Sequence, residues 1–333
     1  MYEDPHTGRK CKAAVKFAVN NARGMAQVFN ESAILRMLND PEVLSRRGHR
    51  FARKMESAVK PLFGSAEMLD IAGPRFQAAA AMMEYAESTV EEQGSYKRAD
   101  LRRNVRAMED LPPGNLIYNY HLDQAQRFLE ELVTIAHNLV HAVDNVNDVG
   151  VLHTNIRPEN ALVTLDCKRR VIICGFGTAL TEEAGFEGGL EVKPGDVAAI
   201  RMWHTHQLAN SKCQEYMQPE AIRVGSDVVC YDSDGWAALM VSLEILGLEL
   251  DVKEMTDTLL KNPKGFGIFV AQHFAQKYRG LCSAEGVDRV RRLAERAVHR
   301  SKPVRRETAG FFQTVFHKIK PTPMRHGYPV PTR

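Results

Sequence analysis

The sequence predicts an α+β domain with a small strand-rich first part and a larger helical second part. Residues 9–19 have the composition of a strand and follow a turn at Thr7 and Gly8. From Leu122 to Val143, apolar residues recur every three or four positions, which is typical of a long amphipathic helix. Residues 236–246 are apolar on nearly every side of a helix, so we expect that helix to be buried.

Shorter elements fill the segments between these three. Residues 30–38 predict a helix that ends near Pro41, and residues 171–173 predict a strand. Residues 76–85 fit either a buried strand or a short helix, because periodicity does not separate the two. Residues 287–298 predict another amphipathic helix.

Two segments have the composition of connections. Residues 87–120 are polar and contain Pro-Pro-Gly at 112–114, which indicates an inserted linker. Residues 321–333 contain four prolines, so we expect an extended tail.

The charge balance excludes whole classes of partner. The 333 residues contain 44 Lys+Arg and 41 Asp+Glu, and the net charge of +3 is too small to indicate nucleic acid or an anionic membrane. No apolar run reaches the ~20 residues that span a bilayer. The six cysteines include no Cys-x-x-Cys pair, so we expect no cysteine-bound metal, while disulfides and buried free thiols both remain open.

Several short motifs follow one another in the second part of the chain. Residues 153–160 read His-Thr-Asn-Ile-Arg-Pro-Glu-Asn, and residues 175–177 read Gly-Phe-Gly directly after a strand. Residues 217–220 read Met-Gln-Pro-Glu, residues 234–236 read Asp-Gly-Trp, and Arg306 follows near the C-terminus.

Three more motifs precede them. Residues 13–16 read Ala-Ala-Val-Lys, and Glu31 stands fifteen residues after the lysine. Residues 83–86 read Met-Glu-Tyr-Ala. In this order and spacing, the whole set resembles the motifs of the protein kinase superfamily.

The resemblance covers about residues 9–318 and implies a bilobal protein kinase-like fold. It places the N-lobe in residues 1–86, an insertion in residues 87–120, the C-lobe in residues 121–320 and the proline-rich tail in residues 321–333. The family has a Gly-rich loop upstream of the lysine, but only fifteen residues precede Lys16. We therefore expect a partial N-lobe and a chain that begins inside the domain, rather than a domain without the loop.

Two departures from the family motifs decide the expected chemistry. The family uses one aspartate to accept the hydroxyl proton and another, in Asp-Phe-Gly, to hold Mg²⁺ on the phosphates. Here Asn155 and Gly175 stand at these positions, and neither a neutral amide nor a glycine can replace a carboxylate. The resemblance therefore implies a pseudokinase with no intact catalytic residue and no metal site. Thr154, in place of an arginine, also removes the cation that would meet a phosphorylated loop.

What the resemblance leaves is a residual nucleotide site that requires no cofactor and binds ATP weakly at most, without Mg²⁺. Its residues are Ala14, Lys16, Glu31, Met83, Glu84, Ala86, Asn160 and Leu162. The alternative for Lys16 and Glu31 is an ion pair that only pins a helix to the sheet.

Other family positions imply structural roles. His153 and Phe176 would stack with Leu35 in a buried column tied to Asp234. Glu220 and Arg306 would form a buried ion pair.

The expected function is that of a scaffold or allosteric partner of a protein, either an active kinase or a host protein. The alternatives are an atypical low-activity Ser/Thr kinase that uses Glu159 or Asp166, and an ATP-binding sensor without transfer. Residues 151–158 are similar to the rhoptry kinase-like group of apicomplexan parasites, which implies secretion into a host cell or parasitophorous compartment. Without that similarity, a cytoplasmic location is expected.

Two further features are interpreted without a function. His204 and His206 are expected to be solvated rather than metal-bound. Asn30 begins a glycosylation sequence, but we expect it to start a helix against the cleft, where no glycan would fit.

Overall fold

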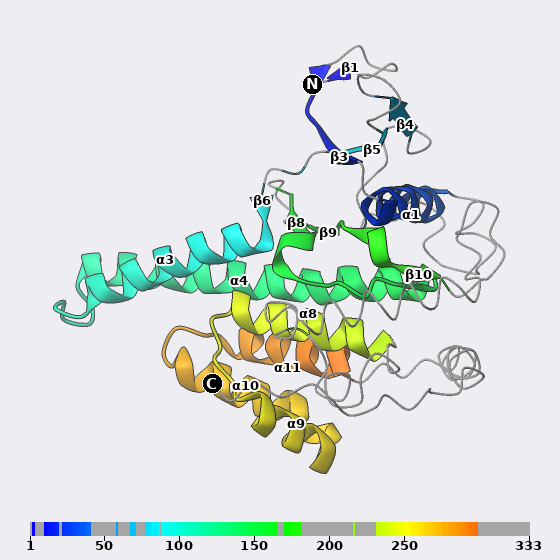
Figure 1. The fold of residues 1–333 in the computed structure, drawn as a ribbon. Helices are drawn as coiled ribbons and strands as arrows, with labels where there is room; N and C mark the ends of the chain where they lie inside the picture. Colours follow the sequence, from blue (N-terminus) through cyan, green and yellow to red (C-terminus); the bar gives the residue numbers. More distant parts are fainter. Residues whose placement is uncertain are drawn as a thin grey trace, which may run out of the picture. The chain divides into compact units, whose positions relative to one another are not determined.

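The computed structural model describes residues 2–3, 10–19, 22–40, 58, 67–70, 77–84, 86, 88–164, 170–181, 216 and 231–298. The chain divides into two units, residues 1–300 and 301–333, and all described residues belong to the first. These residues form both helices and strands, in agreement with the α+β class (Figure 1).

A small antiparallel sheet occupies the N-terminal part. Its strand order is β3-β5-β4, formed by Ala13–Val19, Gln77–Glu84 and Glu67–Asp70. Strand β5 settles the open choice for residues 76–85. The register places Lys16 opposite Ala81 and Ala14 opposite Met83. Strands β1 (Tyr2–Glu3) and β2 (Lys10–Cys11) form a separate pair, and helix α1 spans Ala22–Asn39.

A helical hairpin occupies most of the segment whose composition indicated a linker. Helix α3 (Val90–Met108) begins with a capping box, in which the Thr89 hydroxyl accepts from the Glu92 N–H and the Glu92 carboxylate accepts from the Thr89 N–H. Helix α4 (Leu116–Asp148) follows after a turn that contains the two prolines, and the Asn115 side chain caps it. The run of polar residues therefore reflects a helix in which only Val90, Gly94 and Leu101 are buried.

Short strands and further helices complete the described part. The strands are β6 (Ser88–Thr89), β7 (Val151–Leu152), β8 (Ala161–Val163), β9 (Val171–Ile173) and β10 (Leu180–Thr181). They form a sheet of order β6-β8-β9 and a β10-β7 pair. The helices are η1 (Pro158–Asn160), η2 (Phe176–Thr178), α8 (Tyr231–Ile245), α9 (Val252–Lys261), η3 (Pro263–Gly265), α10 (Phe266–Lys277) and α11 (Ala284–Val298). None of the helices among the described residues is long and apolar enough to cross a membrane.

The main core lies where α4, α8 and α11 pack against one another (Figure 1). The side chains of Leu132, Ile135 and Leu139 on α4 are fully buried there. Trp236 on α8 is only 2% exposed, which confirms the predicted burial of this helix. Ser242, a polar residue inside this core, donates to the Ala238 carbonyl at 2.7 Å and is therefore satisfied within its own helix.

The C-terminal end of α8 is held by side chains from two other helices. Arg98 of α3 donates to the carbonyl oxygens of Glu244 at 2.6 Å and Ile245 at 3.1 Å. The Tyr278 hydroxyl donates to the Leu246 carbonyl at 2.6 Å, and Lys277 donates to the Gly247 carbonyl. Because the last carbonyls of a helix lack partners within it, these contacts satisfy them and complement the helix dipole.

Two leucines of α4, one buried and one exposed, provide a matched test of this core. We expect Leu139→Ala to lower the free energy of unfolding by about 2–5 kcal/mol, because it leaves a cavity between packed helices. Leu116→Ala removes the same atoms from the same helix where the side chain is 85% exposed, so we expect a change within about 0.5 kcal/mol. Urea denaturation of both variants measures the difference, and equal losses would contradict the packing described.

Candidate functional site

The centre of the site is the buried carboxylate of Asp234 at the start of α8. One of its oxygens accepts from the His153 N–H at 2.7 Å and from the Asn147 side chain at 2.9 Å. The other accepts from the Thr154 N–H at 2.9 Å. Because Asp234 is only 2% exposed, these donors replace the water that the charge has lost. The carboxylate thereby fixes the loop after β7 to both α4 and α8.

Thr154, which makes part of this attachment, has an unusual backbone conformation. Its φ is +66°, in the left-handed region that a β-branched residue rarely adopts. Such a conformation costs about 1–3 kcal/mol and persists only where neighbouring contacts impose it. While its N–H binds Asp234, the Thr154 hydroxyl lies 3.0 Å from the carbonyl oxygen of Thr178 and 3.1 Å from the hydroxyl of Thr178. The loop is thus also joined to the turn η2.

His153 is fully buried with both ring nitrogens satisfied. Its Nε2 lies 2.9 Å from the Cys174 carbonyl, and its Nδ1 lies 3.2 Å from the Asn155 N–H. Since a carbonyl only accepts and an N–H only donates, the ring carries its proton on Nε2 and is neutral. Burial lowers its pKa. The ring meets Phe176 edge-on at 4.7 Å, which brings together the two residues expected to stack.

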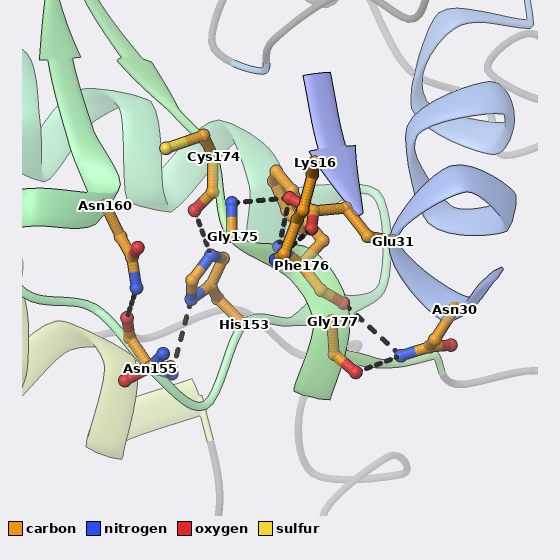
Figure 2. Close-up of polar contacts among 10 residues, drawn as sticks. All are labelled: Lys16, Asn30, Glu31, His153, Asn155, Asn160, Cys174, Gly175, Phe176 and Gly177. Carbon is orange, nitrogen blue, oxygen red and sulfur yellow. Dashed lines mark hydrogen bonds and ion pairs between the residues drawn. The ribbon is translucent and has the colours of Figure 1, made fainter. Parts of the chain in front are cut away.

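Figure 2 shows how Glu31 of α1 connects Lys16 to the backbone around Gly175. One carboxylate oxygen pairs with the Lys16 ammonium. The other accepts from the Gly175 N–H at 2.8 Å and the Phe176 N–H at 3.1 Å. The Glu31 side chain is 1% exposed, whereas that of Lys16 is 41% exposed. Lys16 therefore retains access to solvent, while Glu31 is committed to contacts within the protein.

Asn30, the neighbour of Glu31, binds backbone carbonyl groups of the same turn (Figure 2). Its side-chain amide donates toward the carbonyls of Phe176, Gly177 and Ala179 at 3.3, 3.2 and 3.1 Å. Two adjacent residues of α1 therefore bind both the N–H and the C=O groups of residues 175–179. The side chain is buried, which agrees with the interpretation against glycosylation. The expectation that Asn30 starts a helix is wrong, because α1 already begins at Ala22.

The positions of the two expected aspartates are occupied by a neutral arrangement. The Asn160 side chain donates to the Asn155 carbonyl at 2.9 Å. Gly175 has a φ of +83°, and a Cβ at this residue would lie 2.7 Å from the Asn160 side-chain oxygen. Gly175 is thus required both by its backbone and by the space that Asn160 fills. The described residues contain no group of three or more His, Cys, Asp or Glu that could hold a metal ion.

Cys174 precedes this glycine but is not reactive. Burial raises the pKa of its thiol to about 12. The thiolate, which is the nucleophilic form, is therefore essentially absent near neutral pH.

The expected nucleotide residues are only partly brought together. Ala14 and Met83 pair across β3 and β5, and Ala13 pairs with Glu84, whose side chain lies outside the described residues. Leu162, half-buried on β8, pairs with Ile172 of β9. Ala86, which lies between β5 and β6 in the sequence, is half-buried. The polar cluster itself unites Lys16, Glu31, His153, Asn155, Asn160, Gly175 and Phe176.

Several sequence-based expectations fall outside the described residues. These are the Glu220–Arg306 ion pair, Asp166, and the histidines at 204 and 206. Glu159, the other proposed acid, has a 53% exposed side chain and lies 3.7 Å from the Arg157 Nε. Sequence reasoning missed the roles of Asn30 and Thr178, and the one available signal for Asn30 was its position directly before Glu31.

The Asp234 carboxylate can be tested by an isosteric change. Asp234→Asn keeps the shape but removes the charge and turns an amide group toward one of the three donors. We expect a loss of about 3 kcal/mol in the free energy of unfolding. Asp257→Asn on α9, where the carboxylate is half-exposed, should change it by no more than about 0.5 kcal/mol. Similar losses in both variants would contradict the role of Asp234.

The neutral state of His153 predicts a pH dependence. Because its folded pKa lies below that of the unfolded chain, the unfolded state binds more protons at mildly acidic pH. The stability from this residue is complete above about pH 6.5 and is lost as the pH falls through the folded pKa. Its slope is at most about 1.4 kcal/mol per pH unit. His137 and His141, whose pKa values burial also lowers, add slopes of the same sign.

Urea midpoints between about pH 7.5 and 5.5 measure this slope. We expect wild type to lose stability over that interval and His153→Gln, although less stable at pH 7.5, to lose less. An equal pH slope in the two proteins would show that His153 is not held neutral.

Comparison of the chain with protein-family models and with curated proteins finds no match. The functional interpretation of the site therefore depends on its own residues. These are a buried carboxylate that fixes a loop, an accessible lysine paired with a buried glutamate, and one amide and one glycine at the positions of the two expected acids.

Proposed function

We propose that this protein is a catalytically inactive protein kinase-like protein, a pseudokinase, that acts as a scaffold or allosteric partner of another protein. The observation that carries the proposal is the arrangement of Asn155 and Gly175, at the two positions where the family motifs have aspartates, together with Asn160, which contacts both. The order of the motifs supports the kinase-like part of the proposal, and the contacts of these three residues support the inactive part.

The first missing group is the proton acceptor. Phosphoryl transfer to a hydroxyl needs a base within hydrogen-bond reach of that hydroxyl. The side chain of Asn155 is a neutral amide that cannot take up this proton. The backbone carbonyl of Asn155 accepts from the Asn160 side chain. Glu159 is exposed beside Arg157 instead, which argues against the alternative of a low-activity kinase that uses this carboxylate.

The second missing group is the metal ligand. Mg²⁺ is held by carboxylate oxygens together with the phosphates and water. Gly175 has no side chain, and both oxygens of Glu31 are engaged by Lys16 and by two backbone N–H groups. Recruiting either oxygen of Glu31 to a metal would compete with the contacts that this oxygen already makes. The residues present therefore favour nucleotide binding without Mg²⁺, if a nucleotide binds.

A nucleotide sensor without transfer is the second candidate, and one observation favours it. The Lys16 side chain is 41% exposed although it is paired with Glu31. An ammonium has three N–H donors, so Lys16 can still offer one to a phosphate. This sensor and the scaffold share the same inactive chemistry and differ only in the ligand that they respond to.

The way the site is held together favours the scaffold. Asn30 and Glu31 bind the turn at 175–179, and Thr154 joins that turn to the loop that Asp234 fixes. These contacts join α1, the turn and the loop into one rigid arrangement. A partner, such as an active kinase or a host protein, that binds segments held in this way meets a smaller ordering cost.

The proposal predicts the outcome of an assay with labelled ATP and generic protein substrates. We expect no transfer above background, with or without Mg²⁺, because both the base and the metal ligand are absent. We expect a thermal shift with ATP to be small or zero and to be independent of Mg²⁺.

Lys16→Ala distinguishes the remaining possibilities, with Lys264→Ala on η3 as the matched control. A Mg²⁺-independent shift that disappears only in Lys16→Ala would support the sensor, and no shift in any protein would support the scaffold. Transfer that is lost in Lys16→Ala but kept in Lys264→Ala would overturn the pseudokinase proposal.

A further inference from the structure

The turn end of the α3–α4 hairpin carries an exposed apolar group that the fold does not use. Leu116, Ile117 and Tyr120 are 85%, 56% and 62% exposed. Leu116 and Tyr120 are one helical turn apart and so share a face of α4. Between Leu101 of α3 and Ala125 of α4 no residue is buried. We call residues 102–124 the hairpin end.

Other contacts already fix the hairpin. Lys97 of α3 pairs with Glu131 of α4 at 2.6 Å and lies over the Phe128 ring. Nearer the turn, the Asn104 side chain lies 2.8 Å from the His121 ring. In Figure 1 the two helices run side by side. The three apolar side chains are therefore not needed to hold α3 against α4, and a contiguous apolar group of this kind marks an interaction site.

The charges of the hairpin end are separated by sign along the chain, with the basic residues on α3 and the acidic residues after it. Arg102, Arg103 and Arg106 of α3 are exposed, and so are Glu109, Asp110 and Asp123. Among the described residues, the guanidinium groups of Arg102 and Arg106 form no hydrogen bond or ion pair, whereas Arg103 pairs with Asp100. A surface of nearly balanced charge does not favour a polyanion, but it can complement a copy of itself.

We propose that the hairpin end is a contact between two copies of this chain related by a two-fold axis. This inference does not depend on the proposed function. In a two-fold contact both copies use the same patch. If one residue of the first copy contacts a second residue of the other copy, the reverse contact is also made. An antiparallel pair of hairpins that pack side by side forms a four-helix arrangement.

The register of the hairpin locates the axis. Since His121 lies beside Asn104 and the helices are antiparallel, Met108 is level with Ile117. An axis level with Met108 brings Arg106 of each copy against Asp110 of the other. Leu116 of each copy meets Tyr120 of the other when the axis is level with Tyr118, which is one residue, or ~1.5 Å, away. A single axis near this level therefore serves both the apolar side chains and the opposite charges.

The overlap of the two hairpin ends is short. Nine residues of helix span only ~14 Å. The contact is therefore smaller than a standard interface of about 1,600 Å², and we expect a dimer that forms at micromolar or higher concentrations.

Sedimentation velocity of the full chain from about 1 to 200 µM tests the proposal. We expect the weight-average mass to rise from 37.4 kDa toward twice that value. Leu116→Glu with Tyr120→Glu should keep the protein monomeric across the range. The melting temperature at low concentration should stay unchanged, because both side chains are exposed. Ile268→Glu, which alters a 50% exposed apolar residue on α10, should leave the dimer intact.

A charge exchange tests the axis itself. We expect Arg106→Glu to weaken the dimer at least tenfold, and Arg106→Glu combined with Asp110→Arg to restore it, because each exchanged pair faces the other copy. A monomer at all concentrations would overturn the proposal, and so would a dimer that the Leu116 and Tyr120 changes do not affect. Binding of anionic vesicles by a protein that stays monomeric would assign the hairpin end to a lipid surface instead and would also overturn it.

Discussion

The buried carboxylate of Asp234 is the interaction on which the arrangement of the site depends. A charge in the protein interior is costly unless donors surround it, and here two backbone N–H groups and one amide do so. In return the carboxylate sets the path of residues 153–155. That path determines where the His153 ring lies, and the ring in turn binds the Cys174 carbonyl and packs on Phe176. A single side chain on α8 thus positions a loop and, through it, the strand end that leads to Gly175.

The second organising feature is the pair of adjacent residues Asn30 and Glu31 on α1. Asn30 and Glu31 differ in hydrogen-bonding character, since one donates and the other accepts, and the turn at 175–179 presents groups of both kinds. The side chains of α1 therefore bind this turn through both its N–H and its C=O groups. A displacement of α1 would have to break five hydrogen bonds to this turn together with the bond to Lys16, so the helix and the turn are expected to move as one body.

Much of this could be predicted from sequence where the signal is periodic or local. The spacing of apolar residues predicted α4, and the all-apolar run predicted the burial of Trp236. Helix α3 was missed because a helix with three buried positions in nineteen has almost no apolar pattern. The positive φ of Thr154 and the three-carbonyl contact of Asn30 could not be predicted, because each depends on residues that are distant in sequence. The residue types at 155 and 175 are read directly from the sequence. The bond from Asn160 to the Asn155 carbonyl and the close approach of Asn160 to Gly175 could not be predicted.

The contact between Gly175 and Asn160 has a consequence for the history of such a site. An aspartate introduced at 175 would need the Asn160 side chain to leave its bond with the Asn155 carbonyl before the new Cβ could fit. Changes at 155, 160 and 175 are therefore epistatic, and the effect of each depends on the order in which they occur. Under the proposed function, in which an acid at 175 has been replaced by glycine, the Asn160 side chain occupies the space that the acid would need. Restoring the acid then requires a second change at Asn160, so a single reverse substitution is disfavoured.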